Sequence, residues 1–483
     1  MSRSQASHMN DLPYTRMGLE TCRAIHNSSL QILERTGIDV HDDQARSILA
    51  EGGATVDGMR IRLPADLVAW ALSATPQQLT LYNRDGEPAL QARENQAYYG
   101  GGSDCLYVLD HQTGKRRKAV MDDVRQAVKL MDGLDQIDFV MSAFLPSDVD
   151  SRLYDCYQME VMLNLTTKPI VFVTPDFRGC QTAVEMCEVV SGGKEKFREK
   201  PFATCYINVT SGLVANQEAL QKCIFLAEKG LPMLYIPLNA AGVNSPATTA
   251  GCIATMNAGT LLGIVLAQLV REGTPVAVPG WNGGPYNLQT MVGNYVLADE
   301  QGVATSMGKY YDLPVFGLGG STDSKVLDQQ CAAEAALSLF TAHLNGANII
   351  HDSGFMDAGL QGSLQLLAID NDLIGFIRAA SIPVEVNQET LALDVVDELG
   401  PEGDYLSHEH TYKHFRKPYY SKLADKRQYD DWLDQGGTTM EARAAEQVNA
   451  ILESHTVTPL PDKVQKELKK IIAREQELID RED

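Results

Sequence analysis

The sequence predicts an α/β protein: a TIM (β/α)8 barrel with an N-terminal α+β cap and a C-terminal helical extension. Three observations predict this class. Eight short apolar segments alternate with segments of helical period, polar residues follow many of the apolar segments directly, and 483 residues suffice for one large barrel with accessory parts. The expected units are the cap at 9–95, the barrel at 96–382 and the extension at 383–483. The alternative, an open doubly wound sheet, needs fewer strands, and the glycine-rich stretch at 317–320 lacks the GxGxxG spacing.

Composition excludes several classes of function. A net charge of −22 argues against nucleic acids and anionic membrane surfaces as partners. Nine cysteines without a CxxC pair predict free thiols in a reducing compartment. The apolar run at 261–270 is too short to span a bilayer, and no signal peptide is recognisable, so we expect a cytoplasmic protein. Residues 1–8 resemble a leader that precedes the fold.

The cap is expected to mix helices and short strands. Apolar residues at helical spacing predict the first helix, and Gly37 ends it. Pro64 suits the first turn of a later helix. The expected helices are 14–36, 42–51 and 64–73, and the expected strands are 60–63 and 79–82.

The barrel is expected to consist of eight strand–helix units, because strands alternating with helices of about ten or more residues indicate a parallel sheet. The expected strands are 97–101, 137–144, 169–173, 203–209, 232–238, 275–279, 313–318 and 347–351. The expected helices are 121–133, 151–164, 179–190, 216–229, 245–271, 288–310, 328–344 and 362–379.

The extension begins with a predicted strand and helix start at 383–393 and ends with predicted helices at 438–454 and 463–481. The last helix is strongly charged, which favours a solvated helix over one that docks on a partner.

The carboxyl ends of the strands meet at one mouth of a parallel barrel, where ligands bind. Aromatic side chains fall at several predicted strand ends, and a ring of aromatic faces can bind a quaternary ammonium. The alternative is that these side chains only fill the barrel. The candidate substrate-binding residues are Tyr98, Tyr99, Tyr206, Asn208, Asn239, Trp281 and Phe355.

His351 and Asp352 end the last strand, and a histidine beside an acid can act as a general base or bind a carboxylate. The alternative is a core histidine with satisfied hydrogen bonds. We therefore treat His351 and Asp352 as candidate catalytic residues.

Two further patterns are weaker indications of a functional site. On an extended segment His408 and His410 would project to one face, but without a third nearby ligand we expect hydrogen bonding and no metal site. Cys105 and Cys205 lie near strand ends without a nucleophile motif, so we expect buried thiols that behave as small hydrophobes.

Several segments taken together resemble the trimethylamine methyltransferase (MttB) family. They are 36–41 with 49–54, Asn83-Arg84-Asp85, Gly100-Gly101-Gly102-Ser103-Asp104, 322–325, 346–352 and 403–416, and the resemblance runs from about residue 15 to about residue 455. The family has a TIM barrel fold, and its members move a methyl group from an amine to the cobalt of a separate corrinoid protein. The resemblance therefore implies a corrinoid methyl acceptor and no tightly bound cofactor.

Archaeal members of this family carry pyrrolysine, which this chain lacks; the glycines at 319–320 are our candidate for the equivalent position. The resemblance is thus to the branch that uses quaternary amines such as glycine betaine, proline betaine or carnitine. Glycine betaine, giving dimethylglycine, is the best single candidate. Because a quaternary nitrogen leaves as a neutral amine, His351, Asn208 and Asn239 would hold a substrate carboxylate, and Asp352 and Phe355 would seat the cation.

Two alternatives remain open. One is a zinc-dependent corrinoid methyltransferase acting on another methylated amine through His351 or the His408 and His410 pair. The other is a betaine-binding protein without turnover. A large barrel with a charged extension is also expected to form a homo-oligomer.

Overall fold

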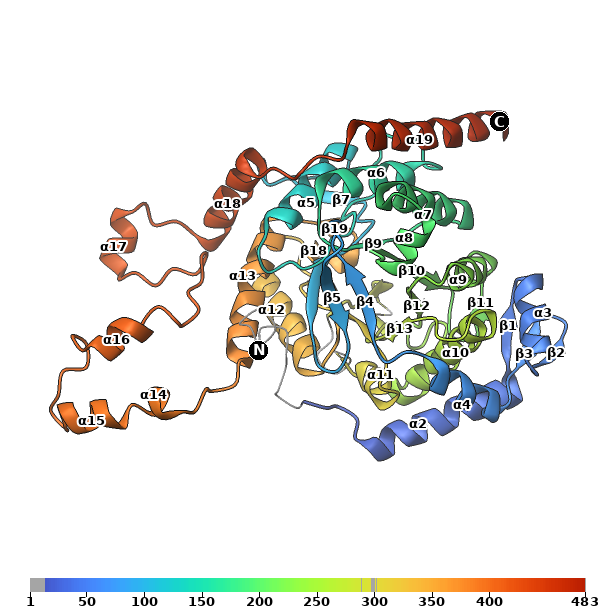
Figure 1. Cartoon of the computed structure of the whole chain (residues 1–483), viewed down its shortest axis with the longest axis horizontal. Helices are drawn as coiled ribbons and strands as arrows, with labels where there is room; N and C mark the ends of the chain where they lie inside the picture. Colours follow the sequence, from blue (N-terminus) through green and yellow to red (C-terminus); the bar gives the residue numbers. More distant parts are fainter. Residues whose placement is uncertain (1–13, 288, 297–299, 301, 483) are drawn as a thin grey trace.

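The barrel is built on a seven-stranded parallel sheet with the order β6-β17-β16-β13-β12-β10-β9 (Figure 1). The computed structural model describes residues 14–287, 289–296, 300 and 302–482, so the expected leader lies outside the described residues. The strands are β6 (Tyr98–Gly101), β9 (Ile170–Phe172), β10 (Ala203–Val209), β12 (Met233–Pro237), β13 (Val276–Pro279), β16 (Val315–Leu318) and β17 (Ile349–Ser353).

An eighth segment closes the ring between β6 and β9. Phe139 forms a parallel bridge with Gly100, and Val140 forms a parallel bridge with Ile170. The expected strand at 137–144 is therefore present only as isolated bridges, of which a third joins Phe144 to Cys105. It occupies the eighth position, and the (β/α)8 barrel predicted from the sequence is confirmed.

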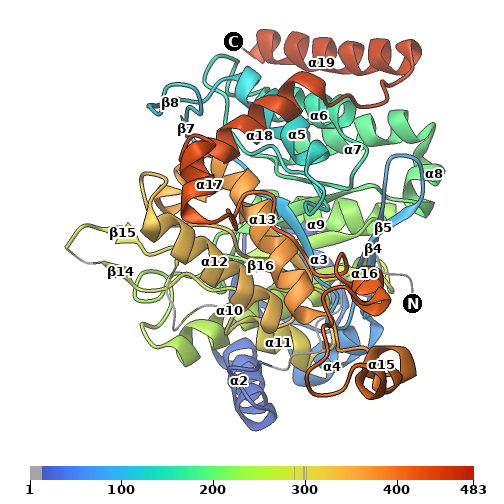
Figure 2. The same ribbon diagram turned by 90° about the vertical axis from the view of Figure 1, so that its left-hand side faces the viewer.

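Helices surround the sheet, and Figure 2 shows α12 and α13 covering one side of it. Side chains of Asp176, Asp328 and Ser363 accept hydrogen bonds from the first turns of α7, α12 and α13, which fixes where these helices begin. The helices are α5 (Met121–Gly133), α6 (Tyr154–Leu165), α7 (Phe177–Ser191), α8 (Lys194–Glu199), α9 (Gln217–Lys229), α10 (Thr249–Val270), α11 (Thr305–Tyr310), α12 (Gln329–Leu344) and α13 (Leu364–Ser381).

Helix α10 is long and apolar enough to cross a membrane, but most of it is buried inside the protein. It packs against α9 and against two helices of the N-terminal segment, α2 (Leu19–Gln31) and α4 (Ala65–Ala74). Its uniform apolar character therefore reflects burial on all sides.

The sixth unit differs from the prediction. The helix expected at 288–310 is wrong over most of its described length: strands β14 (Tyr286–Asn287) and β15 (Val292–Gly293) form a hairpin, and among the described residues of this range only α11 is helical. The Asn287 side chain accepts a hydrogen bond from the Gln289 backbone N–H, and this local turn competes with a helix. Part of the expected helix, residues 288, 297–299 and 301, lies outside the described residues.

The N-terminal segment closes the amino-terminal end of the barrel. Strands β4 (Leu79–Tyr82) and β5 (Pro88–Ala92) form a hairpin whose Leu79, Leu81 and Leu90 pack against residues of the barrel interior. The Tyr82 backbone N–H donates to the carbonyl of Pro201, just before β10. The other elements are α2, a π-helix (Ile32–Thr36), β1 (Ile38–Val40), α3 (Asp43–Glu51), β2 (Thr55–Asp57), β3 (Arg60–Arg62) and α4, with β11 (Val214–Ala215) pairing to β1. The boundary between this N-terminal segment and the barrel, placed at residue 95, stays a prediction.

A small sheet stands beside the carboxyl ends of the barrel strands. It has the order β18-β19-β7-β8 and therefore joins the loops that follow the first and last barrel strands. Its strands are β7 (Tyr107–Leu109), β8 (Arg116–Lys118), β18 (Phe355–Met356) and β19 (Gln361–Gly362), with a 3-10 turn (Asp357–Gly359) between the last two.

The C-terminal segment leaves the barrel and returns to it (Figure 1). Helices α14 to α17 project away from the barrel, α18 packs on α5 and α13, and α19 packs on α6 and α7. The strand expected near 383 is absent from this described part of the chain. The helices are α14 (Gln388–Leu391), α15 (Leu393–Leu399), α16 (Glu409–His414), α17 (Tyr429–Asp434), α18 (Met440–Ser454) and α19 (Asp462–Glu482).

The prediction of a fully solvated final helix is wrong. Leu468, Ile471 and Ile479 of α19 are buried, and buried Glu475 accepts a hydrogen bond from Arg178 of α7 at 2.7 Å. Leu468, Ile471, Glu475 and Ile479 follow one another at separations of three, four and four positions and so share one face of the helix. This face carries apolar side chains and a buried ion pair, and α19 packs with it on the barrel helices.

Candidate active site

Four aromatic rings meet inside the barrel near its carboxyl end. Tyr206 of β10, Phe316 of β16 and His351 of β17 face the interior, and Trp281 follows β13. The Trp281 ring lies 5.0 Å from His351, 5.6 Å from Phe316 and 6.5 Å from Tyr206, measured between centroids. We call these four residues the aromatic cluster. Their mutual angles range from stacked to edge-on, so they present both faces and edges to the mouth.

The imidazole of His351 is held rigidly within the cluster. Its Nδ1 lies 2.6 Å from the carbonyl oxygen of Gly317, and because a carbonyl can only accept, Nδ1 carries a proton. The ring stacks on Phe316 with centroids 4.0 Å apart and planes 20° apart. Its Nε2 therefore points at Asp352, whose Oδ1 lies 3.4 Å away.

Asp352 reaches the same side of the sheet as His351 because β17 is irregular. In a regular strand two consecutive side chains point to opposite faces. The pairing of β17 with β6 shifts register between Ile350 and Ser353, and Asp352 has a φ of 79°. This left-handed conformation is strained for a residue with a side chain, and such strain is concentrated at functional sites.

Asp352 is buried in a closely packed setting. The hydroxyl of Tyr295 donates a hydrogen bond to its Oδ2. Gly102 lies so close that a Cβ there would meet Asp352 Oδ1 at 2.2 Å and the Phe355 ring at 2.3 Å. Burial raises the pKa of the Asp352 carboxyl, and its interactions with His351 and Tyr295 oppose part of that rise.

A second carboxyl, Asp104, lies in the loop after β6 with a φ of 69°. Its Oδ1 lies 3.4 Å from Nε2 of Gln158. Burial raises the pKa of Asp104 to about 6, against weaker opposing hydrogen bonds from Gln158 and Ser103. Burial also raises the pKa of the Tyr206 hydroxyl, and the charges of Asp352 and then Asp104 raise it further, so both carboxyls act on the aromatic cluster.

A cavity of about 590 Å³ opens beside the cluster. Trp281 and Tyr295 line it together with Leu238, Asn282 and Leu360. Such a volume suits a small molecule, and the mixture of aromatic walls with a few polar groups is typical of ligand sites.

Two predicted residues, Tyr98 and Tyr99, do not contribute side chains to the mouth, and a third, Asn239, lines the cavity with an amide that is already hydrogen-bonded. Tyr99 points outward and hydrogen-bonds Nδ1 of His343 at 2.7 Å, because it alternates with inward-facing Tyr98. Tyr98 faces the interior, but its hydroxyl donates to Gln96 at the opposite, amino-terminal end of the strand. The amide of Asn239 is occupied by backbone and side-chain partners: its Oδ1 accepts from the Gly212 N–H at 2.7 Å, and its Nδ2 donates to Thr255.

The other predicted residues lie at the mouth. Tyr206, Trp281, His351 and Asp352 converge, and Phe355 packs beside Asp352. Asn208 is exposed and lies two residues beyond Tyr206, hence on the same interior face of β10.

The substrate-binding prediction missed Phe316 and Tyr295. The alternation of β16 could have identified Phe316, because it lies at an inward-facing position. Tyr295 falls within the wrongly predicted helix, so no local signal identified it.

The remaining candidates behave as buried or capping groups. Burial raises the pKa of Cys105 far above its ordinary value, so this thiol stays protonated. His408 does not share a face with His410: its Nδ1 accepts a hydrogen bond from the His410 backbone N–H at 3.0 Å and caps α16. The extended His408 and His410 pair considered from the sequence is therefore wrong.

Comparison with known proteins identifies the family of this chain. The family model for trimethylamine methyltransferase (MTTB) matches residues 2–479. The trimethylamine methyltransferase MttB of Desulfitobacterium hafniense strain DCB-2 is 31% identical over 457 residues, covering 94% of this chain and 92% of the relative. A glycine betaine methyltransferase of Desulfitobacterium hafniense strain Y51 is 25% identical over 469 residues, covering 95% of this chain and 97% of the relative.

Among solved structures, the monomethylamine methyltransferase MtmB of Methanosarcina barkeri matches with a TM-score of 0.47 at 12% identity, covering 93% of this chain and 96% of its own. That likeness is too distant to carry an argument. Because the family model spans almost the whole chain, this protein belongs to the trimethylamine methyltransferase (MTTB) family and is a methyltransferase.

Proposed function

We propose that this methyltransferase moves a methyl group from a quaternary amine, with glycine betaine as the best single candidate, to the Co(I) of a corrinoid. One observation carries the proposal: the aromatic cluster lies with the two carboxyls Asp352 and Asp104 at the barrel mouth of a chain without pyrrolysine. The glycine betaine methyltransferase among its relatives supports the choice of substrate.

The cluster suits a cation that carries methyl groups. Each cation–π contact contributes about 0.5–2 kcal/mol, most when the cation is desolvated. Trp281 is the strongest such surface in the cluster, and Tyr206 and Phe316 lie within 6.5 Å of it. Asp352 and Asp104 supply negative charge in the same space, so a trimethylammonium group is bound by faces and charge together.

The chemistry agrees with the absence of pyrrolysine. The electrophilic ring of pyrrolysine can capture an amine through its lone pair, and a quaternary nitrogen has none. The carbon–nitrogen bond breaks with both electrons staying on nitrogen, while Co(I) supplies the electron pair of the new carbon–cobalt bond. The amine leaves neutral, so no proton is transferred, and positioning and exclusion of water carry the rate.

We assign roles accordingly. The cation lies against Trp281 and Asp352, with Phe355 packed beside that carboxylate. Asn208, His351 and Asn239 are our candidates for the substrate carboxylate, and Asn239 lines the cavity with an amide that already bonds to Gly212 and Thr255. The corrinoid is a methyl acceptor that approaches the mouth, carried by a partner protein or free.

We also propose that the chain is a cytoplasmic homo-oligomer. All nine cysteines are free and buried, as expected in a reducing compartment. In the projecting C-terminal segment Val384, Leu406 and Tyr412 are 87%, 84% and 72% exposed, and such exposure favours contact with another protein surface. Sedimentation velocity measures this directly, and a monomer at micromolar concentration would contradict it.

A methyl-transfer screen tests the function. The purified chain is incubated with chemically reduced cobalamin and glycine betaine, proline betaine, carnitine or trimethylamine, and methylcobalamin is followed by absorbance. We expect methylcobalamin with a betaine and none with trimethylamine. If no quaternary amine yields methylcobalamin while trimethylamine does, the substrate class is wrong; if none of the compounds reacts, the catalytic proposal fails.

The pH dependence of substrate binding follows from Asp104. Its carboxyl, with a pKa of about 6, is ionised above that pH and neutral below it, and a cation binds the ionised form. The apparent affinity should therefore fall about tenfold between pH 8 and pH 5. KM measured across this range checks the prediction, and Asp104→Asn should flatten the change near pH 6. A parent KM that is constant from pH 5 to pH 8 would contradict it.

A further inference from the structure

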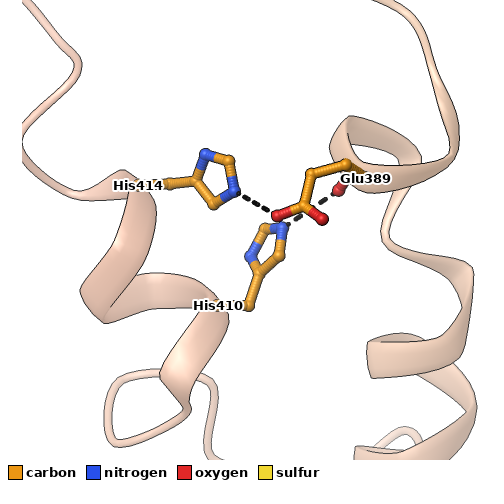
Figure 3. Close-up of side chains that lie close together, drawn as sticks. All are labelled: Glu389, His410 and His414. Carbon is orange, nitrogen blue, oxygen red and sulfur yellow. Dashed lines mark hydrogen bonds and ion pairs between the residues drawn. The ribbon is translucent and has the colours of Figure 1, made fainter.

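We propose that Glu389, His410 and His414 form a zinc site that fixes the projecting C-terminal arm, residues 383–422. Figure 3 shows the three side chains turned toward one another, with Glu389 on one segment and the two histidines on another. Their potential ligand atoms all lie within 4.8 Å of one another. Two imidazoles and a carboxylate are a ligand set that Zn²⁺ accepts.

The geometry comes from two short helices. His410 and His414 are four residues apart in α16 and so lie on one face of it. Glu389 of α14 faces them, and its Oε1 lies 3.1 Å from Nε2 of His414. Nε2 of His410 lies 3.2 Å from the backbone oxygen of Glu389, and the two imidazole centroids are 4.3 Å apart.

Only a small adjustment separates this arrangement from a coordinated ion. Zinc–ligand bonds of about 2.1 Å in a tetrahedron place ligand atoms about 3.4 Å apart, slightly closer than the present limit of 4.8 Å. Lys413 also contacts Glu389 at 2.5 Å, and a bound zinc ion would take the place of this ion pair. The fourth position stays open to water.

The arm has a physical need for such a link. No residue from 383 to 422, all of which the structure describes, is buried, so this stretch has no core of its own. Helices α14 and α16 are too short to be stable in isolation. A metal that joins residue 389 to residues 410 and 414 closes a loop of about 20 residues and supplies the missing cohesion, as it does in other small segments.

The site is structural and separate from the methyl-transfer site. Figure 1 shows α14, α15 and α16 projecting away from the barrel, whereas Asp352 belongs to a strand of the barrel itself. A zinc ion in the arm would therefore be structural and would not activate a substrate. Loss of this site leaves the quaternary-amine proposal untouched, and the reverse also holds.

Zinc titration of the full-length protein tests the site. The chain is stripped with EDTA, dialysed and titrated with ZnCl₂, and bound metal is measured by mass spectrometry after gel filtration. We expect one Zn²⁺ per chain, and we expect the His410→Ala/His414→Ala variant to bind at least tenfold more weakly. His408→Ala is the matched control: this neighbouring histidine caps α16 outside the cluster, so its removal should leave zinc affinity within twofold of the parent.

Limited trypsin digestion gives a second readout. Lys413 and Arg416 are cleavage sites in or next to α16, and zinc should slow cleavage there in the parent but not in the double variant, whereas Mg²⁺ should have no effect. Because the arm is exposed, the double variant should keep the parent melting temperature without zinc. Sub-stoichiometric zinc in the parent, equal zinc affinity in the double variant, or cleavage rates indifferent to zinc would each overturn the proposal.

Discussion

Asp352→Asn should lower kcat/KM for a quaternary amine by roughly 10- to 150-fold, because it removes the charge that faces the cation while keeping the shape. Contacts to a charged partner contribute about 1.5–3 kcal/mol, and each 1.4 kcal/mol is tenfold. The same change relieves the burial of a carboxylate whose pKa is raised, so the melting temperature should stay or rise. Methylcobalamin formation and thermal unfolding measure the two effects.

Two comparisons sharpen this result. Tyr295→Phe removes only the hydrogen bond to Asp352 and should have a smaller effect on kcat/KM. Binding of 3,3-dimethylbutanoate, in which carbon replaces the ammonium nitrogen of glycine betaine, should be insensitive to Asp352→Asn. If kcat/KM of the Asn variant stays within twofold of the parent, or if the carbon analogue, which lacks the positive charge, loses as much affinity as glycine betaine, Asp352 does not seat the cation.

Trp281→Ala should raise KM for the quaternary amine by roughly 20- to 30-fold. It removes the indole that stands within 5.0–6.5 Å of the other three rings, and a desolvated cation–π contact is worth about 2 kcal/mol. Trp281→Phe should recover part of the loss, because an aromatic face returns. Steady-state kinetics of methyl transfer provides the measurement.

Trp432→Ala is the matched control for this variant. Trp432 lies in α17, outside the barrel, where its Nε1 donates to the carbonyl of Thr438. Removing it should leave KM unchanged. Normal binding and turnover by Trp281→Ala would show that the aromatic cluster is barrel filling, which is the alternative that the sequence left open.

The barrel was predictable because its signal is local and repeated. Eight apolar segments separated by helical segments specify the same architecture even when one of them does not form a regular strand. The stretch at 137–144 contributes only three isolated bridges, yet the ring closes. The hairpin at 286–293 was missed because the Asn287 turn and the pairing of β14 with β15 compete with a helix over a short range.

The candidate site was predictable only in part. Residue type and strand-end position identified Tyr206, Trp281, His351 and Asp352 as neighbours. Strand-end position alone places both Tyr98 and Tyr99 at the mouth. Neighbouring side chains of a strand point to opposite faces, and Tyr99 points outward to His343. The histidines at 408–414 show the same limit. The spacing of an extended segment places His408 and His410 on one face, whereas α16 places His410 and His414 on one face.

The sequence by itself determined the fold class, the family resemblance and the chemical type of the site, because periodicity and residue type are local properties of the chain. Only the tertiary structure decided which side chains share the mouth. The register shift in β17 and the left-handed backbone of Asp352 place two consecutive residues on one face, against the alternation of a regular strand. This conformation depends on packing against Gly102, Tyr295 and Phe355. Gly102 and Tyr295 lie far from Asp352 in the sequence, and Phe355 lies three residues after it, so no local pattern encodes these contacts.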